Sequence, residues 1–231
     1  MRKLFVAGCS FSDYTGVDRV YGEFLAEKLG YDYVHEGAGC GSNWRIWRVI
    51  TNHVLSGNLT PDDLLVVQYT SRDRGEFWTS FPQPDKAFKP HTKNHLSIID
   101  KFRDGGHVIR FKAEAKQWQQ NPEECDFFRV YEKYFVSTQF EQERFRIHNF
   151  MFQHMLLSNK IRTIFVRSSR LPKVQDKELL PEFLAHSMTT PMPESPDHNL
   201  TPSDTSHLSQ FGHEVFAGWL YEHINKFNLK G

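Results

Sequence analysis

The chain has little cysteine, no net charge and no long apolar run. Its three cysteines in 231 residues are an odd number, far below the density of a disulfide scaffold. Lysine plus arginine and aspartate plus glutamate both number 28, so no electrostatic argument favours a nucleic-acid partner. No apolar run approaches the roughly 20 residues of a membrane span. The apolar stretch after Met1-Arg2-Lys3 is also shorter than the roughly 7–15 residues of a secretion signal, so we expect a cytoplasmic chain.

Aromatic residues, by contrast, are plentiful. The chain holds 20 Phe, 8 Tyr and 5 Trp, which predicts thick packing layers or an aromatic-lined site. Hydrophobic residues make up 39% and charged residues 24%, which is enough apolar material for a core and too much for general disorder. We therefore expect one domain over residues 1–231, with an insertion at about 75–157.

Short apolar runs alternate with helical patterns, which is typical of a parallel sheet with helices on both faces. The predicted strands cover residues 3–9, 31–36, 63–70 and 161–168, and a short fifth strand is expected within the proline-rich stretch 172–202. The predicted helices of this alternation cover residues 20–29, 43–55 and 208–227. The fold class is therefore α/β, a three-layer α/β/α fold of the flavodoxin-like type with a parallel central sheet.

The insertion is predicted to be helical and rich in aromatic residues. Residues 75–121 contain prolines and little periodicity, so we expect a loop with one or two short helices. Residues 123–157 predict a long helix or a helix pair, whose aromatic stripe is expected to pack in the core. Members of that stripe include Phe140, Phe145, Phe150 and Met151. We expect the whole insertion to serve as a lid or as a surface for a protein partner.

The last helix carries its own expectations about burial. Ser209 is the expected N-cap. The residues expected to face inward are Phe211, Val215, Ile224 and either Trp219 or Leu220. His213 is expected to be a capping or exposed residue of this helix.

Polar residues follow the predicted strands. The relevant segments are Gly8-Cys9-Ser10-Phe11-Ser12-Asp13, Glu36-Gly37-Ala38-Gly39-Cys40-Gly41-Ser42-Asn43, Thr70-Ser71-Arg72-Asp73-Arg74 and, before the last helix, Asp204-Thr205-Ser206-His207. In an open parallel sheet, ligands bind outside the carboxyl ends of the strands. These segments therefore predict the position of the site.

The segments hold the parts of an acyl-transfer site. The Ser10 hydroxyl needs a base, because a free hydroxyl is a weak nucleophile. Asp204 precedes His207 by three residues, about one helical turn, so its carboxylate can reach back to orient the imidazole. Backbone N–H groups of the glycine-rich second segment suit an oxyanion, and a donor near Ser71 or Arg72 would complete that hole.

The same segments resemble the SGNH (GDSL) hydrolases, in particular the platelet-activating-factor acetylhydrolase-like proteins and the bacterial and phage SGNH proteins. The resemblance rests on Gly8-Cys9-Ser10, on the glycine-rich second segment and on Asp204-Thr205-Ser206-His207-Leu208-Ser209 before the last helix. It implies a catalytic triad with Ser10 as nucleophile, His207 as base and Asp204 as the carboxylate that orients the base.

The resemblance also implies an oxyanion hole. Its second-block donor aligns with Cys40, or with Gly41 or Gly39 if the register of the loop differs, and acts beside the N–H of Ser10. The third block reads Thr70-Ser71-Arg72 where the family has Gly-x-Asn. The asparagine donor is therefore missing, and Ser71 or Arg72 is expected to take its place.

Other residues near the site admit two interpretations. Cys9 is a rival nucleophile, but its position at the end of the strand favours a buried structural thiol. Asn43 and Arg45 are expected to bind substrate, and the alternative for Arg45 is a pair with Glu36.

No cofactor is expected. His91-Thr92-Lys93-Asn94-His95 has metal-like spacing, but no cysteine or carboxylate motif accompanies it. The glycine-rich segment lacks both the Gly-x-Gly-x-x-Gly spacing and the lysine of a P-loop. We therefore expect neither a metal nor a nucleotide.

Together, the residues and the resemblance predict a serine hydrolase of the esterase class. Its expected substrate is an ester in which a small acyl group is attached to a carbohydrate or a lipid. Two alternatives stay open. One is an O-acyltransferase that uses the same triad with a sugar hydroxyl as acceptor. The other is a binding or structural module, since loss of one oxyanion donor typically lowers the rate by ~10²–10³.

Overall fold

A five-stranded parallel sheet forms the centre of the computed structural model, which describes residues 1–14, 17–38, 41–70, 74–79, 100–101, 107–112, 138–167, 189–191 and 207–226. The strands are β1 (Lys3–Gly8), β2 (Asp32–Gly37), β3 (Leu64–Tyr69), β7 (Arg162–Arg167) and β8 (Thr189–Pro191). They lie in the order β2-β1-β3-β7-β8, which is the flavodoxin-like order. The predicted strands, including the short fifth one, are confirmed.

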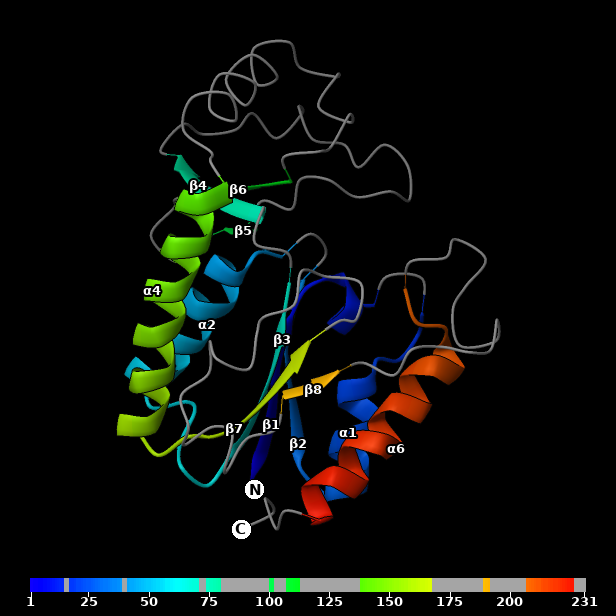
Figure 1. Cartoon of the computed structure of the whole chain (residues 1–231). Coiled ribbons are helices and arrows are strands. Elements are labelled where there is room, and N and C mark those ends of the chain that lie inside the picture. Colours follow the sequence, from blue (N-terminus) through cyan, green and yellow to red (C-terminus); the bar gives the residue numbers. More distant parts are fainter. Residues whose placement is uncertain are drawn as a thin grey trace.

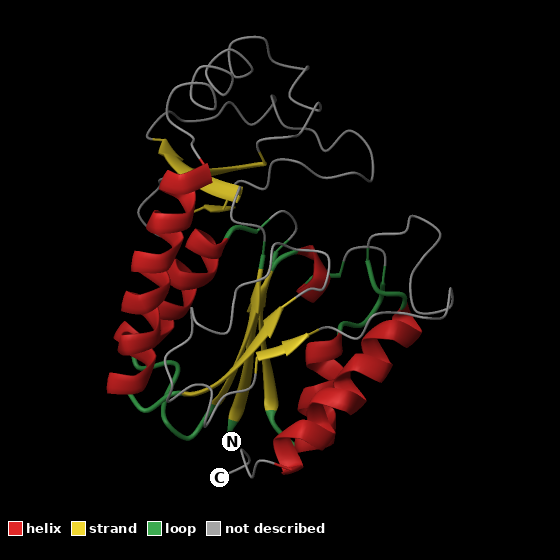
Figure 2. Cartoon of the chain, viewed as in Figure 1, coloured by secondary structure: helices red, strands yellow, loops and turns green. Residues whose placement is uncertain are grey.

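Two pairs of helices cover the two faces of this sheet (Figure 1). Helices α1 (Tyr21–Leu29) and α6 (Gln210–Lys226) pack on one face, and α2 (Asn43–Leu55) and α4 (Thr138–Ser158) pack on the other. The result is the three-layer α/β/α arrangement that the sequence predicts (Figure 2).

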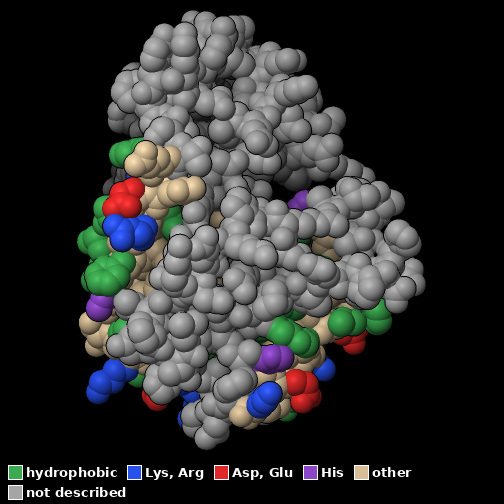
Figure 3. Space-filling model, in the orientation of Figure 1, with side chains coloured by type: hydrophobic (Ala, Val, Ile, Leu, Met, Phe, Trp, Pro, Cys, Tyr) green, Lys and Arg blue, Asp and Glu red, His purple; other side chains and the backbone are tan. Residues whose placement is uncertain are grey.

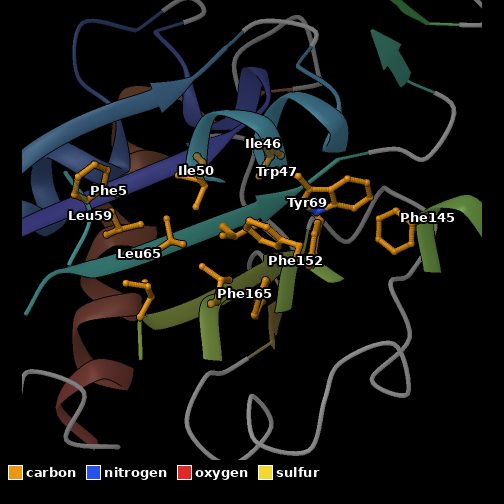
Figure 4. Close-up of a cluster of buried hydrophobic side chains, with 14 residues drawn as sticks. Phe5, Ile46, Trp47, Ile50, Leu59, Leu65, Tyr69, Phe145, Phe152 and Phe165 are labelled. Atoms are coloured by element: carbon orange, nitrogen blue, oxygen red, sulfur yellow. The ribbon is translucent and has the colours of Figure 1, made fainter. Parts of the chain in front are cut away.

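Alternate residues of each strand point to opposite faces, which divides the core into two clusters. In β1, Phe5 and Ala7 pack with α2 and α4, whereas Leu4 and Val6 pack with α1 and α6. The cluster under α2 and α4 is rich in aromatic rings that point toward one another from the sheet and the helices (Figure 4). Six aromatic side chains are buried in this layer, so part of the aromatic content packs the core as predicted.

Strand β3 lies between β1 and β7 and is buried along its whole length. Buried on both faces, such a strand is normally a continuous apolar run. Leu64 and Val66 pack toward α1 and α6, and Gln68 follows them in the same row. Gln68 is the polar exception, and it is fully buried near the end of the strand.

A second, antiparallel sheet lies beyond the carboxyl ends of the main strands (Figure 1). It contains β4 (Arg74–Thr79), β6 (His107–Lys112) and β5 (Asp100–Lys101), in that order. The prediction of a loop with short helices is wrong at these positions. Each longer strand carries adjacent aromatic or β-branched residues, Phe77-Trp78 and Val108-Ile109, and their β preference is expressed despite the prolines elsewhere in the segment.

Helix α4 covers the main sheet with one side only. Phe145 is buried, as predicted, but Phe140, Phe150 and Met151 are 53%, 52% and 62% exposed. Apolar side chains show on the surface along this helix in Figure 3. A helix that lies on a sheet buries a single stripe, so aromatic residues distributed around it cannot all reach the core. Neither α4 nor any other helix in the described part of the chain is long and apolar enough to cross a membrane.

Helix α6 buries only part of its predicted inward face. Its buried residues are Gly212, His213, Phe216, Ala217, Leu220 and Ile224. Leu220 and Ile224 were predicted to face inward, but Phe211 and Val215 are 57% and 37% exposed. His213 was predicted to be a capping or exposed residue of this helix, whereas its side chain lies in the buried stripe. The N-cap is confirmed, since the Gly212 N–H donates to Ser209 Oγ at 3.0 Å.

A buried histidine joins α6 to α1. The His213 ring is 1% exposed and stacks on the Tyr21 ring, with centroids 6.1 Å apart. Its Nδ1 accepts a hydrogen bond from the Tyr21 backbone N–H at 3.1 Å. His213 therefore caps the first residue of the neighbouring helix from a buried position.

Burial of the ring, and to a smaller degree the nearby His207, lowers the pKa of His213 from 6.5 to about 4. Between these two values the unfolded chain binds a proton that the native state does not bind. The free energy of unfolding therefore rises with pH across this window and is independent of this residue above it.

We predict that His213→Gln flattens the pH dependence of stability. Through His213 the wild-type chain should lose about 2 kcal/mol of unfolding free energy between pH 7 and pH 5, since one pKa unit corresponds to 1.36 kcal/mol. Urea unfolding of both chains at the two pH values measures this difference. His154→Gln, on the exposed side of α4, is the matched control. If His213→Gln and the wild type lost the same unfolding free energy between pH 7 and pH 5, the lowered pKa of His213 would not be the cause.

Candidate active site

Ser10 lies at the carboxyl end of β1. After Gly8 the chain passes through Cys9 into a single 3-10 turn, η1 (Ser10–Ser12), the short helix at the end of the sheet in Figure 2. The Ser12 N–H donates to the Cys9 carbonyl at 2.8 Å and closes the turn. The half-buried Ser10 side chain therefore sits at the edge where parallel strands end and ligands bind.

His207 reaches Ser10 from the other end of the chain. It lies three residues before α6, and its Nε2 is 2.8 Å from Ser10 Oγ, a hydrogen bond between residues 197 positions apart. The imidazole also packs on the Phe11 ring, with centroids 5.1 Å apart. The structure thus brings together the predicted nucleophile and the predicted base.

Five further members of the predicted triad and oxyanion hole lie outside the described residues. They are Asp204, Gly39, Cys40, Ser71 and Arg72. Their roles stay predictions. Because Nε2 of His207 faces Ser10, Nδ1 is the ring atom at which a carboxylate would orient the imidazole.

Gly41 is not placed to donate to an oxyanion. It is buried, and its N–H donates to the Ala38 carbonyl at 2.9 Å, which closes a turn of the second loop. Its predicted role as an alternative donor is therefore corrected, because the donor is already used. The N–H of Ser10, in contrast, donates to no acceptor in the described part of the chain.

Asn43 holds the end of β3 instead of facing a substrate. Its side chain is buried, its Nδ2 donates to the Thr70 carbonyl at 3.0 Å, and its Oδ1 accepts from the Thr70 N–H at 2.9 Å. These two bonds tie the first residue of α2 to the residue that follows β3. The predicted contact with substrate is corrected, because both ends of the amide are bound to the backbone.

Arg45 pairs with Glu36, which is the alternative that the sequence left open. The buried guanidinium donates to the Glu36 carbonyl at 2.5 Å and to its carboxylate at 3.4 Å. His53 Nε2 donates to the same carboxylate at 2.7 Å. Burial acts to raise the pKa of Glu36, but the His53 hydrogen bond and the Arg45 charge outweigh it and hold that pKa below its usual range. These contacts hold the end of β2 against α2.

The turn is also tied to β2 on its outer side. Asp13 follows η1, and its Oδ1 accepts a hydrogen bond from His35 Nε2 at 3.3 Å. His35 Nδ1 in turn lies 2.9 Å from the Tyr33 hydroxyl.

Within the described ranges, no group of three or more His, Cys, Asp or Glu side chains is arranged to hold a metal ion.

Sequence reasoning missed the polar residues beneath the turn. Ser12 Oγ donates to Gln68 Oε1 at 2.7 Å and lies 2.9 Å from the Tyr21 hydroxyl, and all three side chains are fully buried. Cys9 is buried beside them, as predicted for a structural thiol. The sequence feature that could have predicted these contacts is Gln68. A polar residue in a fully buried strand needs a hydrogen-bond partner, and its partner here belongs to the nucleophile turn.

Two glycines allow the turn to approach the sheet. A Cβ atom at Gly8 would collide with Ser12 Oγ, and one at Gly37 would collide with the backbone oxygen of Ser12. Larger residues at these strand ends would therefore push η1, and Ser10 with it, away from the sheet.

No protein-family model matches the sequence, and no curated protein matches it. Solved structures do match. The psychrotrophic esterase EstA from Pseudoalteromonas sp. has a TM-score of 0.54 and 9% identity, over 99% of both chains. Est2A, an acetyl xylan esterase from the rumen bacterium Butyrivibrio proteoclasticus, has a TM-score of 0.53 and 13% identity, over 99% of this chain and 65% of that one.

A third structure matches less well. It is a protein from Desulfitobacterium hafniense DCB-2 ascribed to the G-D-S-L lipolytic family, with a TM-score of 0.48 and 10% identity over 96% of this chain and 99% of that one. At this TM-score it carries no weight. The likeness to the two esterases shows that the chain shares their fold, which agrees with the three-layer α/β/α class that the sequence predicts.

Proposed function

We propose that the chain is a serine esterase, which cleaves a carboxylic ester through an acyl-serine intermediate. The observation that carries this proposal is the 2.8 Å hydrogen bond between Ser10 Oγ and His207 Nε2 at the carboxyl edge of the sheet. The fold shared with two proteins named as esterases supports it.

In the first half of the reaction, Ser10 Oγ attacks the carbonyl carbon of the ester while its proton passes to His207 Nε2. Before the attack the neutral ring carries its one proton on Nδ1, which Asp204 is proposed to hold, and after the transfer the ring is an imidazolium cation. When the tetrahedral intermediate collapses, the bond from the carbonyl carbon to the alcohol oxygen breaks. The alcohol leaves with the proton from His207, and Ser10 stays acylated.

The carbonyl oxygen carries a negative charge in that intermediate. We assign the Ser10 N–H to it, because this donor has no acceptor in the described part of the chain. Cys40, with Ser71 or Arg72 beside it, is the proposed source of the remaining donors.

In the second half, a water molecule attacks the acyl carbon. His207 takes a proton from the water and returns it to Ser10 Oγ as the carboxylic acid leaves.

The proposed substrate carries a small acyl group on a carbohydrate or a lipid. The acetyl xylan esterase among the structural neighbours favours an acetylated carbohydrate for the first trials.

We predict that Ser10→Ala abolishes covalent labelling by a fluorophosphonate and hydrolysis of short-chain and acetylated-sugar esters. The hydroxyl is the attacking group, so its removal leaves nothing to acylate. Intact-protein mass spectrometry measures the label. Ser56→Ala, at the exposed C-terminal end of α2, is the matched control and should label as the wild type does. Undiminished labelling of Ser10→Ala would remove Ser10 as nucleophile.

Product analysis separates hydrolysis from transfer. With an acetylated substrate and an added sugar acceptor, the proposed esterase should release acetate, whereas an O-acyltransferase should form the acetylated acceptor. A wild-type chain that neither labels nor turns over any ester of the panel would favour the binding module.

We also predict that His207→Ala lowers kcat/KM by about 10²–10⁴-fold, the usual contribution of a general base. The wild-type rate should rise with pH where an imidazole loses its proton, because only the neutral ring accepts a proton from Ser10. His154→Ala on α4 is the control for loss of a histidine, and thermal unfolding checks that each variant is folded. A loss of only a few-fold, or a flat profile from about pH 5 to 8, would contradict the role of His207.

A further inference from the structure

We propose that Gln68 is the positioning residue for the nucleophile. Its buried amide holds the η1 turn on both sides of Ser10 and so keeps the Ser10 hydroxyl in line with His207. The inference rests on the proposed function of Ser10 and His207, and it adds a residue that contacts neither of these two side chains.

The amide contacts the chain before and after the nucleophile. Gln68 Nε2 is 3.4 Å from the Sγ atom of Cys9, the residue before Ser10. Gln68 Oε1 accepts a hydrogen bond at 2.7 Å from Ser12 Oγ, two residues after Ser10. One side chain on β3 therefore holds both ends of the segment that presents the Ser10 hydroxyl.

The hydrogen bonds around Gln68 allow only one assignment of donors and acceptors. Nε2 also donates to the Tyr69 backbone carbonyl at 3.1 Å, which fixes the orientation of the amide because a carbonyl only accepts. Oε1 must then accept, so Ser12 gives its one hydroxyl hydrogen to Gln68. The Tyr21 hydroxyl, 2.9 Å from Ser12 Oγ, must therefore donate to Ser12. Burial raises the pKa of Tyr21, which keeps this hydroxyl protonated as a donor.

Burial makes this arrangement costly to change. Gln68, Ser12 and Tyr21 are all fully buried, and a buried polar group that loses its hydrogen-bond partner is strongly destabilising. The turn therefore cannot move away from β3 without leaving unsatisfied groups behind.

The sheet leaves space for the contact. A Cβ atom at Gly8 would collide with Ser12 Oγ and would lie 2.9 Å from Gln68 Oε1, so the hydrogen bond fills the place that a side chain on β1 would occupy. Because β3 lies between β1 and β7, the anchor belongs to a strand that is held on both sides.

Tyr21→Phe separates a positioning role from a merely structural one. It removes a hydroxyl from the same buried chain of hydrogen bonds but leaves both contacts of Gln68 with the turn. If the chain of bonds only stabilised the fold, variants at Tyr21 and Gln68 would act alike. If Gln68 positions Ser10, only loss of the Gln68 contacts should slow the reaction of Ser10.

The test is the rate of fluorophosphonate labelling of Ser10, measured well below the melting temperature of each variant. Gln68→Met keeps the length of the side chain without the amide, and it should label at least about tenfold more slowly, since small misplacements in a site have large effects on rate. Ester turnover should lose kcat with little change in KM. Tyr21→Phe should stay within about threefold of the wild type.

Ser12→Ala is the second variant, because it removes a single oxygen and disturbs packing least. It should also slow labelling, and the double variant should be no slower than Gln68→Met alone, since Gln68→Met already breaks the contact that Ser12→Ala removes. Labelling of Gln68→Met and Ser12→Ala at the wild-type rate would overturn the inference. Equal slowing of these two and Tyr21→Phe would overturn it as well.

A wild-type chain that does not label at Ser10 would refute the proposed function instead. A second measurement needs no reaction of Ser10 and decides the inference in that case. In an NMR titration of the His207 ring, Gln68→Met should shift the midpoint in the same direction as Ser10→Ala, because both lose the hydrogen bond between Ser10 and His207. A midpoint in Gln68→Met that stays at the wild-type value would overturn the inference.

Discussion

The contact between the start of α1 and the start of α6 decides where His207 lies. Gln210, the first residue of α6, accepts hydrogen bonds from the backbone N–H groups of Asp18 and Arg19, both at 3.1 Å, and its Nε2 donates to the Arg19 carbonyl at 3.1 Å. One turn later, His213 caps α1. The segment that precedes α6 is thereby held at the carboxyl edge of the sheet. This is how residues 197 positions apart form the hydrogen bond on which the site depends.

Buried polar side chains hold the strand ends around that contact. Asn43 binds Thr70 after β3, Arg45 binds Glu36 in β2, and Gln68 binds Ser12 after β1. Each replaces water with a specific partner, and in a low-dielectric interior such bonds fix one arrangement because a mismatched one leaves groups unsatisfied. The apolar interior of the sheet stabilises the fold. The polar side chains at its carboxyl edge are hydrogen-bonded to specific partners and fix the positions of the strand ends.

Strands β1, β3 and β7 could be predicted because each contains a short apolar run that ends in glycine or polar residues. Ser10 could be predicted because it follows such a strand, and His207 because it follows Asp204 just before the last helix. Other features depend on tertiary context. His213 is polar yet lies in the buried stripe of α6, since the Tyr21 N–H is there to be bound. Gly41 resembles a free donor in the sequence, but its N–H closes a turn. Local pattern does not show which partner a polar group will find.

Gln68 lies between these two cases, because its polarity was visible in the sequence and its partner was not. In the row Leu64, Val66, Gln68, two apolar residues pack under α1 and α6 before the amide appears. An amide buried without hydrogen bonds is strongly unfavourable, so its presence in a strand covered on both faces implies that the strand has reached other polar groups. In a parallel sheet those groups lie in the loops at the strand ends. Gln68, which ends the apolar run of β3, therefore marks the position along the strand where the hydrophobic core ends and the candidate active site begins.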